Sequence, residues 1–274
     1  MRRLVLRARY ISKQRFQKII YGYFKKNARN FPWRRTHDPY RILVSEMMLQ
    51  QTQVSRVEPK YRKFISTFPD FSALARASLS RVLRLWQGLG YNRRALALKA
   101  IAKSVVRDYR GRLPDDLGKL MSLPGIGQAT ASAIMAFVFN KPFPFLETNI
   151  RTVYIHFFFK GRKNVSDSAL LKRLTETLDV KNPRQWYYAL MDYGAMLKAT
   201  RGNLSRQSKG YHSQSPFIGS RRELRGQILR LSLRKPHWQF KKILDKLLLE
   251  RKWERPEIEK TYHSLVREGF FKKS

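Results

Sequence analysis

The amino-acid sequence predicts an all-α protein on three observations. Apolar residues recur at helical spacing in seven segments, Pro- and Gly-containing turns separate these segments, and runs with strand-like composition are few. Residues 154–159 are β-prone by composition, but periodicity alone does not distinguish a strand from a buried helix there. The predicted helical segments are Phe16–Phe24, Ile42–Val57, Leu79–Trp86, Leu96–Val106, Ala131–Phe139, Leu170–Leu178 and Trp186–Leu197.

Length and composition set the class of protein. The chain has 274 residues, of which 43% are hydrophobic, enough for one large domain or two small ones with a core. No apolar run approaches the roughly 18 residues of a membrane span, and the basic, aromatic N-terminus lacks the apolar stretch of a secretory signal. We therefore expect a cytoplasmic, nucleoid-associated protein with no membrane partner, and we expect it to be a monomer.

The charge of the chain indicates a polyanionic partner. Its 57 Lys and Arg outnumber its 19 Asp and Glu, and the formal charge is +38. Because self-repulsion at this charge destabilises a compact state, nucleic acid is a better explanation than solubility. A membrane surface is less favoured, since no long basic amphipathic helix stands out. Acidic residues are absent before Asp38, and Glu223 is the only one from Lys198 to Lys235. The sequence therefore predicts two phosphate-facing surfaces, with a solvated tail as the alternative for the first.

The absence of cysteine excludes several kinds of chemistry. Without cysteine the chain has no disulfide, no thiolate zinc site, no iron–sulfur cluster and no cysteine nucleophile. The five histidines are scattered and lack the spacing of metal ligands. The sequence therefore predicts no metal and no cofactor.

The first segment with candidate chemistry surrounds Glu46. This carboxylate lies in an otherwise apolar helical run, so we expect it to be partly desolvated and to hold a proton near neutral pH. For a lone Glu, an exposed position on a polar face would be the better interpretation. Polar Gln50, Gln51 and Gln53 follow directly, however, and amide side chains can insert at base edges. The group as a whole favours a catalytic acid beside a DNA-binding segment.

The second segment is a Gly-Leu-Gly turn that is followed by Tyr91, Arg93 and Arg94. An exposed tyrosine beside two arginines offers an aromatic wedge next to phosphate ligands. Taken alone, the segment fits a helix C-cap followed by a basic helix equally well.

The third segment is a Leu-Pro-Gly-Ile-Gly-Gln turn at 123–128 between two apolar helical stretches. Such a turn predicts a helix–hairpin–helix element, in which glycines allow close approach to a DNA phosphate and amides are exposed at the start of the second helix. Glu147 follows downstream as a carboxylate that could act on bound DNA. The predicted DNA-binding residues of this turn are Gly125, Ile126, Gly127, Gln128 and Thr130.

The C-terminal part differs from the rest in composition. Residues 201–220 are crowded with Ser, Gln, Gly, Asn and basic residues, which predicts a flexible linker. Three short helices are predicted after it, at Arg225–Leu233, Phe240–Glu250 and Glu257–Glu268. They form either a helical cap on the main domain or a small winged-helix-like module whose basic helix reaches DNA.

In their order along the chain, these motifs resemble those of the helix–hairpin–helix DNA glycosylases, and most closely the MutY-type adenine glycosylases. The resemblance covers roughly residues 15–200, about two thirds of the chain. It implies a two-lobed all-α domain over 1–200, with the basic segment 1–30 folding back onto the second lobe. A basic linker at 201–220 would replace the iron–sulfur loop, and a small helical or winged-helix-like module would occupy 221–274. Further matching segments are Phe31–Arg34, Phe145–Val153 and Met191–Met196.

The resemblance also implies a reaction and roles for individual residues. It implies base excision repair, in which double-stranded DNA is bound and adenine mispaired with 8-oxoguanine or guanine is flipped out and hydrolysed from its sugar. Glu46 would protonate adenine at N7, Glu147 would stabilise the oxocarbenium-like sugar, and Asn149 would position Glu147. Gln50, Gln51 and Tyr91 would enter the base stack around the oxidised guanine.

The sequence departs from the family pattern at four places. Glu147 and Thr148 stand where the family has Asp and Gly, which moves the carboxylate one methylene further out. Ala129 replaces the lysine of bifunctional relatives, so strand cleavage is not expected. Lys198 stands at the first cluster cysteine, which resembles a clusterless member. The residues after Gly219 are too few for the domain that reads the oxidised guanine, so this task would fall to the glutamines, Tyr91 and, as a further candidate, the tail.

Two other functions stay open at this point. The first is a glycosylase for another base, such as thymine or uracil opposite guanine, because related mismatch glycosylases share the hairpin and the carboxylate. The glutamine-rich segment favours adenine. The second is a DNA-binding protein without catalysis, in which Glu147 marks a decayed site. Retention of Glu46 and Asn149 argues against decay.

Overall fold

The computed structural model describes residues 11–211 and 213–271. This part of the chain contains fourteen α-helices and no β-strand, with one isolated bridge between Val165 and Ser208. The prediction of an all-α fold is confirmed. None of the described helices is long and apolar enough to span a membrane.

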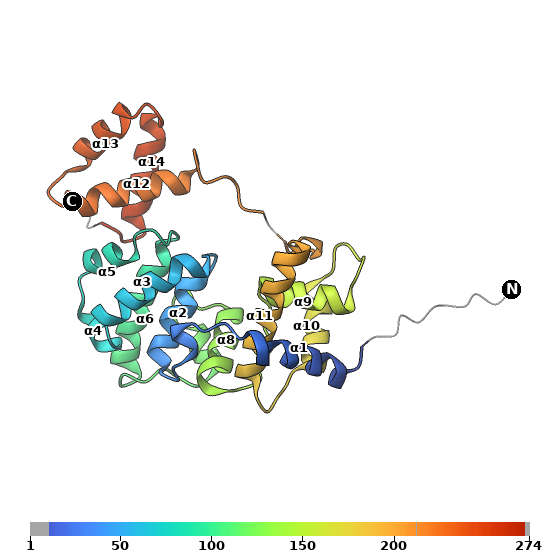
Figure 1. The fold of residues 1–274 in the computed structure, drawn as a ribbon. Coiled ribbons are helices and arrows are strands. Elements are labelled where there is room, and N and C mark those ends of the chain that lie inside the picture. The colour runs from blue at the N-terminus through green and yellow to red at the C-terminus, as the bar shows by residue number, and fades with distance from the viewer. Residues whose placement is uncertain (1–10, 212, 272–274) are drawn as a thin grey trace. The chain divides into compact units, whose positions relative to one another are not determined.

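Most of the helices follow one another through turns and short loops, whereas a longer segment separates α11 from α12 (Figure 1). They are α1 (Lys13–Asn27), α2 (Pro39–Leu49), α3 (Val54–Thr67), α4 (Phe71–Arg76), α5 (Leu79–Trp86), α6 (Arg93–Asp108), α7 (Leu117–Met121), α8 (Gln128–Phe139), α9 (Thr148–Phe158), α10 (Asp167–Thr177), α11 (Pro183–Arg201), α12 (Arg221–Arg234), α13 (Phe240–Leu249) and α14 (Arg255–Arg267), with 3₁₀ turns η1 (Pro32–Arg34) and η2 (Leu204–Gln207).

Most predicted helical segments lie within observed helices, and three differences stand out. Residues 154–159, whose β-prone composition left a strand and a buried helix both open, belong largely to α9. The prediction of one helix over Ile42–Val57 is wrong, because α2 ends at Leu49 and α3 begins at Val54. Helices α4 and α7 are not predicted from the sequence, since they have six and five residues and are too short to show a helical period.

The described residues divide into two compact units. The first comprises residues 11–37, 115–121, 126–211 and 213, and the second comprises 38–114, 122–125 and 214–271. The first unit therefore holds α1 and α7–α11, and the second holds α2–α6 and α12–α14. Residues 1–10 of the predicted N-terminal segment lie outside the described part.

Helix α11 is the centre of the first unit, where it packs against α1, α8 and α9. Apolar residues on α1 fill this core: Phe16 is fully buried and makes edge-to-face contacts with Tyr154 and Trp186, each with ring centroids 5.6 Å apart. Aromatic pairs in this geometry add stability beyond the area that they bury. The segment after Ser12 is thereby held against α11.

A buried ion cluster also holds the N-terminal segment on α11. Asp192 is 2% exposed and accepts from Arg29 Nε at 2.6 Å and from Arg34 Nη1 and Nη2 at 2.8 Å. Although burial opposes ionisation, the hydrogen bonds and charge of Arg34, with those of Arg29, hold the pKa of Asp192 below its ordinary value. Since breaking a buried pair leaves an uncompensated charge, the cluster ties 29–34 to the centre of α11.

The second unit places α4 against α6, and α2 against α3 and α6. Trp86, Phe64 and Phe68 are buried in its core. Helices α12, α13 and α14 form a three-helix module around Leu224, Ile228 and other apolar residues, and α12 also packs against α5. No strand occurs in the described residues 221–271, so the module is helical and lacks the strands of a wing. Glu268 binds both Arg93 of α6 and Arg225 of α12, which joins the module to the rest of the unit.

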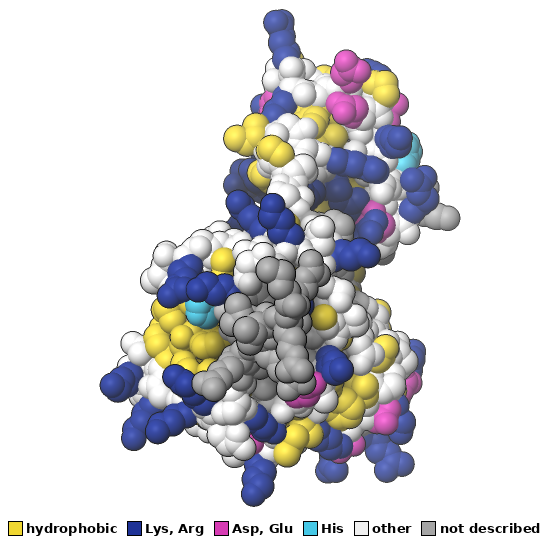
Figure 2. Space-filling model, turned by 90° about the vertical axis from the view of Figure 1, so that its right-hand side faces the viewer, with side chains coloured by type: hydrophobic (Ala, Val, Ile, Leu, Met, Phe, Trp, Pro, Cys, Tyr) yellow, Lys and Arg dark blue, Asp and Glu magenta, His cyan; other side chains and the backbone are white. Residues whose placement is uncertain are grey.

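The excess of basic residues is visible at the surface. On the face of the described chain in Figure 2, Lys and Arg side chains far outnumber those of Asp and Glu. A field of this sign attracts polyanions over distances of about a Debye length.

Candidate active site

The helix–hairpin–helix element consists of α7 and α8, which pack against each other, and the exposed turn between them. Gly125 has φ +77°, and a Cβ on it would lie 2.8 Å from the Cβ of Ala97, so the fold itself requires glycine there. Gly127 has φ −88°, and a Cβ added to it would meet no atom within 4 Å. Gly127 is the N-cap of α8 and supplies no side-chain cap to the first amides of this helix. The space beside Gly127 is open. This geometry leaves room for the phosphate that the sequence predicts at this turn.

The other predicted residues of the hairpin lie at the same turn. Gln128 and Ala129 are exposed in the first turn of α8, while Thr130 is half-buried. Ile126 is only 4% exposed, so it anchors the turn.

Glu147 is the N-cap of α9 and is half-buried. Its Oε1 accepts from the backbone amide of Ile150 at 2.8 Å, and its Oε2 accepts from Nδ2 of Asn149 at 3.2 Å. Burial raises the pKa of Glu147, against the opposing effects of these two residues and of the positive charges on Arg29 and Lys198. Asn149 therefore lies at the position that its predicted role requires, beside the carboxylate.

Gly194 of α11 packs closely against the backbone at the start of α9. A Cβ on Gly194 would lie 2.2 Å from the backbone oxygen of Asn149 and 2.7 Å from its Cβ. The backbone of Asn149 is thus in direct contact with α11, and the position of the neighbouring Glu147 depends on this contact. Any larger residue at 194 must displace one of the two helices.

For the base-excision activity that the family resemblance implies, we expect Gly194→Ala to lower the single-turnover rate by about a hundredfold, because a shift of about 1 Å at a catalytic group has effects of this size. The free energy of unfolding should fall by about 1–3 kcal/mol from overpacking. Gly22→Ala is the control: it lies in α1, where an added Cβ would meet no atom within 4 Å, and helix propensity predicts unchanged or slightly higher stability. Equal excision by the Gly194 variant and wild type would show that α9 tolerates displacement.

We expect Glu147→Gln to stabilise the protein at neutral pH. Because the folded-state pKa of Glu147 is raised, ionisation opposes folding, and stability is lost as pH rises through that pKa. Gln keeps the acceptor for Ile150 but carries no charge. The melting temperature should exceed that of wild type near pH 7.5, and the difference should vanish below the ordinary value of 4.5.

Thermal melts followed by circular dichroism across this pH range measure the difference. The control is Glu58→Gln, which removes a surface carboxylate paired with Arg62. A Glu147→Gln variant that is less stable than wild type at pH 7.5 would contradict the expectation.

Glu46 lies on α2, whose other residues from Ile42 to Met48 are all buried. Glu46 itself is half-buried. This matches the predicted partly desolvated carboxylate. Asp38 caps α2 by accepting from the amides of Tyr40 and Arg41, and Pro39 occupies its first position, so local sequence determines where this helix begins.

The position of Arg94 differs from the one that the sequence predicts. The sequence predicts an exposed phosphate ligand at this position, but Arg94 is 7% exposed. Its guanidinium donates to the carbonyls of Met47 at 2.9 Å, Met48 at 2.8 Å and Gln50 at 2.6 Å, at the end of α2. It also donates to the carbonyls of 89–91 and to Thr52. Burial lowers the pKa of Arg94 to about 10.

Arg94 thus joins two turns that hold residues in the left-handed region. Gln51 has φ +53° and Tyr91 has φ +46°, values that non-glycine residues adopt at an energetic cost. Both side chains are exposed, Tyr91 to 38%. The strained backbone and the buried guanidinium together direct Gln51 and Tyr91 to the surface.

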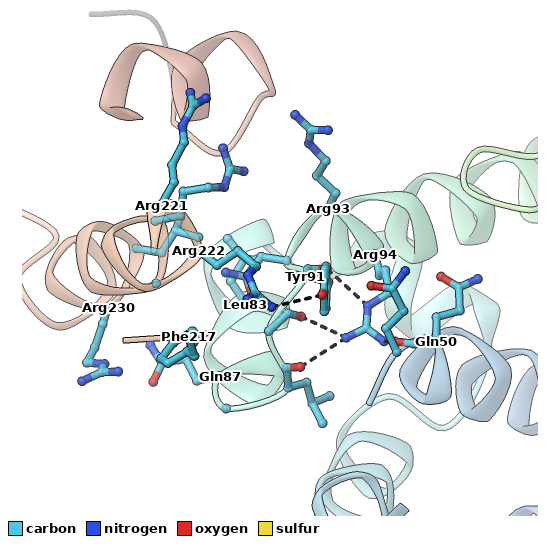
Figure 3. Close-up of a pocket in the computed structure, with 18 of the residues that line it drawn as sticks. Gln50, Leu83, Gln87, Tyr91, Arg93, Arg94, Phe217, Arg221, Arg222 and Arg230 are labelled. Carbon is cyan, nitrogen blue, oxygen red and sulfur yellow. Dashed lines mark hydrogen bonds between the residues drawn. The ribbon is translucent and has the colours of Figure 1, made fainter. Parts of the chain in front are cut away.

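The structure brings several predicted DNA-binding residues into one pocket of the second unit (Figure 3). Gln50, Gln51, Tyr91, Arg93 and Arg94 all line it. Gln53 does not line this pocket and is the exposed N-cap residue of α3.

The sequence interpretation missed the pocket's opposite wall. Gln214 and Phe217 line it from the segment whose composition predicts a linker, and Arg222 lines it from α12. The basic, nearly acid-free stretch between Lys198 and Lys235 predicts a phosphate-facing surface there, but not which of its residues line the pocket.

The segment after α11 lies where the family resemblance places an iron–sulfur loop. The sequence has no cysteine, and Lys198 is exposed. Residues around η2 are instead held by backbone hydrogen bonds between Val165 and both Gln207 and Lys209, each of 2.9 Å. Arg151 adds a bond to Ser208 Oγ at 2.9 Å. Protein hydrogen bonds therefore organise this segment.

Comparison with known proteins identifies relatives of the chain. Residues 44–178 match the model of the HhH-GPD superfamily base excision DNA repair protein family. The adenine DNA glycosylase of Buchnera aphidicola subsp. Baizongia pistaciae is 36% identical over 186 residues, covering 66% of this chain and 52% of that protein. The thymine/uracil-DNA glycosylase of Methanothermobacter thermautotrophicus is 32% identical over 189 residues, covering 68% of this chain and 86% of that protein.

A solved structure has a similar fold. That of a thermostable thymine-DNA glycosylase matches with a TM-score of 0.62 and 29% identity, over 70% of this chain and 89% of that one. The chain spans about half the length of the Buchnera adenine glycosylase that it matches.

Proposed function

The chain belongs to the HhH-GPD superfamily of base excision DNA repair proteins, and from this premise we propose that it is a monofunctional DNA glycosylase that removes adenine opposite 8-oxoguanine or guanine. The observation that carries the proposal is the half-buried Glu46 on α2, followed at the end of that helix by surface glutamines. Adenine glycosylases are among the relatives, which supports adenine as the base.

In this reaction the N-glycosidic bond breaks, adenine leaves with a proton on its ring, and water adds to C1′ of the sugar. Glu46 donates the proton to N7, which turns adenine into a better leaving group. Glu147 faces the positive charge that develops on the sugar, and Asn149 holds its carboxylate through the 3.2 Å hydrogen bond. The raised pKa of Glu147 reflects a partly desolvated site, where a carboxylate interacts more strongly with a cation.

The hairpin would bind the DNA backbone. Gly127 leaves room for a phosphate at the uncapped start of α8, and the basic surface supplies the long-range attraction. Ala129 offers no amine for a Schiff base, so we propose base release without strand cleavage. We also propose that the enzyme works without an iron–sulfur cluster.

A single-turnover assay with enzyme in excess tests the proposal on duplexes that contain adenine opposite 8-oxoguanine. We expect free adenine and a strand that breaks only after alkaline treatment. If no adenine is released from this duplex or from one with adenine opposite guanine, the proposal is wrong.

Thymine or uracil opposite guanine is the second candidate substrate. One observation favours it. This chain matches 86% of the length of the Methanothermobacter thymine/uracil glycosylase but only 52% of the length of the Buchnera adenine glycosylase. Duplexes with these mismatches, assayed in parallel, decide between the two substrates.

A further inference from the structure

One pocket of the second unit lies between the 87–94 turn and α12 with its preceding segment (Figure 3). We call it the α12 pocket. Its volume of about 830 Å³ lies within the range of about 300–1,000 Å³ that is typical of small-molecule sites. The catalytic chemistry proposed above does not use its α12 wall.

The α12 pocket is strongly cationic. Seven of the lining residues are arginines, and no described residue of its lining is acidic. Two of these arginines, Arg93 and Arg225, share the carboxylate of Glu268, and Arg94 is bound to carbonyls. Arg221 and Arg230 are exposed, and neither makes an ion pair with any residue in the described part of the chain. The pocket therefore has cationic groups available for an anion.

The α12 pocket also offers aromatic surface. Phe217 is 58% exposed, although phenylalanine is among the most often buried residues, and Tyr91 is 38% exposed. Exposed rings beside guanidinium groups match the chemistry of a nucleotide, whose base stacks on a ring while its phosphate pairs with arginine.

Hydrogen bonds connect the two walls of the α12 pocket. Arg222 donates to Tyr91 Oη at 3.3 Å and to Gln214 Oε1 at 3.2 Å. Gln214 in turn donates to Gln51 Oε1 at 3.3 Å. The segment before α12 is thereby linked to the two surface residues that have left-handed backbone conformations.

We infer that the α12 pocket binds one nucleotide of the DNA, with its base against Phe217 and Tyr91 and its phosphate at Arg230. The inference rests on the proposed function in that DNA is the ligand. It assigns the C-terminal module to DNA binding and makes residues 214–230 a determinant of affinity for the damaged duplex.

The experiment measures binding by fluorescence anisotropy across a salt series. The probe is a labelled duplex with a tetrahydrofuran abasic site opposite guanine, which cannot be cleaved. We expect Phe217→Ala to weaken binding about tenfold with little change in the salt dependence, since a stacked base is lost. Arg230→Ala should weaken binding and lower the slope of log K against log salt by about one, since one phosphate contact is lost.

Matched controls lie on the same module outside the pocket. Arg234→Ala removes an exposed charge one turn further along α12, and Leu249→Ala removes a 77% exposed apolar side chain on α13. Phe217→Leu keeps an apolar side chain but not the ring, and it should also weaken binding. Thermal melts confirm that each variant is folded.

The outcomes separate this inference from the proposed function. If the Phe217 and Arg230 variants bind the duplex as tightly as the two controls do, the inference is overturned, whether or not wild type excises adenine. If these variants lose affinity while wild type releases no base from any mismatch, the pocket binds DNA and the proposed glycosylase activity is wrong.

Discussion

Glu46→Gln is expected to lower single-turnover excision of adenine by about a thousandfold, with duplex affinity within about twofold of wild type. General acid catalysis typically contributes 10²–10⁴-fold, and Gln has the shape of Glu but no proton to transfer. Glu46 is half-buried, and the other residues of α2 from Ile42 to Met48 are buried. Water therefore has limited access to this position and should not take over as the proton donor. Binding should persist, because the proposed phosphate and base contacts lie at other residues.

Rapid-quench kinetics and anisotropy on the same duplex measure the two quantities. Glu58→Gln is the matched control, since it removes a carboxylate from α3 in the same unit that pairs with Arg62 at the surface. Excision by Glu46→Gln at more than a tenth of the wild-type rate would show that Glu46 is not the acid.

Arg94→Met is expected to lower the free energy of unfolding by about 3 kcal/mol or more. Met fills much of the same volume, but it leaves the carbonyls of Met47, Met48 and other buried groups without their donor. Each unsatisfied buried group costs about 1–3 kcal/mol. The loss should also release Gln51 and Tyr91 from their left-handed conformations and weaken DNA binding.

Chemical denaturation measures the stability. Arg94→Lys keeps the charge but not the planar fork of donors, so it should recover only part of the loss. Arg93→Met is the control: the Arg93 side chain is 72% exposed, and Glu268 keeps its ion pair with Arg225 without it, so the loss should be at most about 1 kcal/mol. Equal stability of the two Met variants would refute a structural role for Arg94.

The candidate site was predictable from sequence where it depends on neighbours along the chain. Glu147 was predicted as a carboxylate downstream of the hairpin, but its N-cap position was not, because Ser, Thr, Asp and Asn are the usual caps. Gly125 and Gly127 could be placed at a turn because they interrupt two helical runs. The sequence could not predict why glycine occurs at each position. A side chain at Gly125 would clash with Ala97, whereas Gly127 faces open space.

Contacts between distant residues explain what sequence reasoning missed. No glycine or proline interrupts Ile42–Val57, so periodicity predicts one helix there. Arg94, 46 and 47 residues away, donates to the carbonyls of Met48 and Met47 and thereby stabilises a helix end at Leu49. The contact of Gly194 with Asn149 is equally distant in sequence and has no local signal.

The sequence by itself predicted the all-α class, the hairpin, the two candidate carboxylates and a polyanionic partner. Each follows from composition or from interactions within a few residues, which helical periodicity, capping and charge record directly. The tertiary structure alone decided where α2 ends, that Arg94 is buried, and that residues 214–230 form a pocket with Gln51 and Tyr91. These features depend on donors, acceptors and packing surfaces far apart in the chain, whose pairing exists only once the helices have packed.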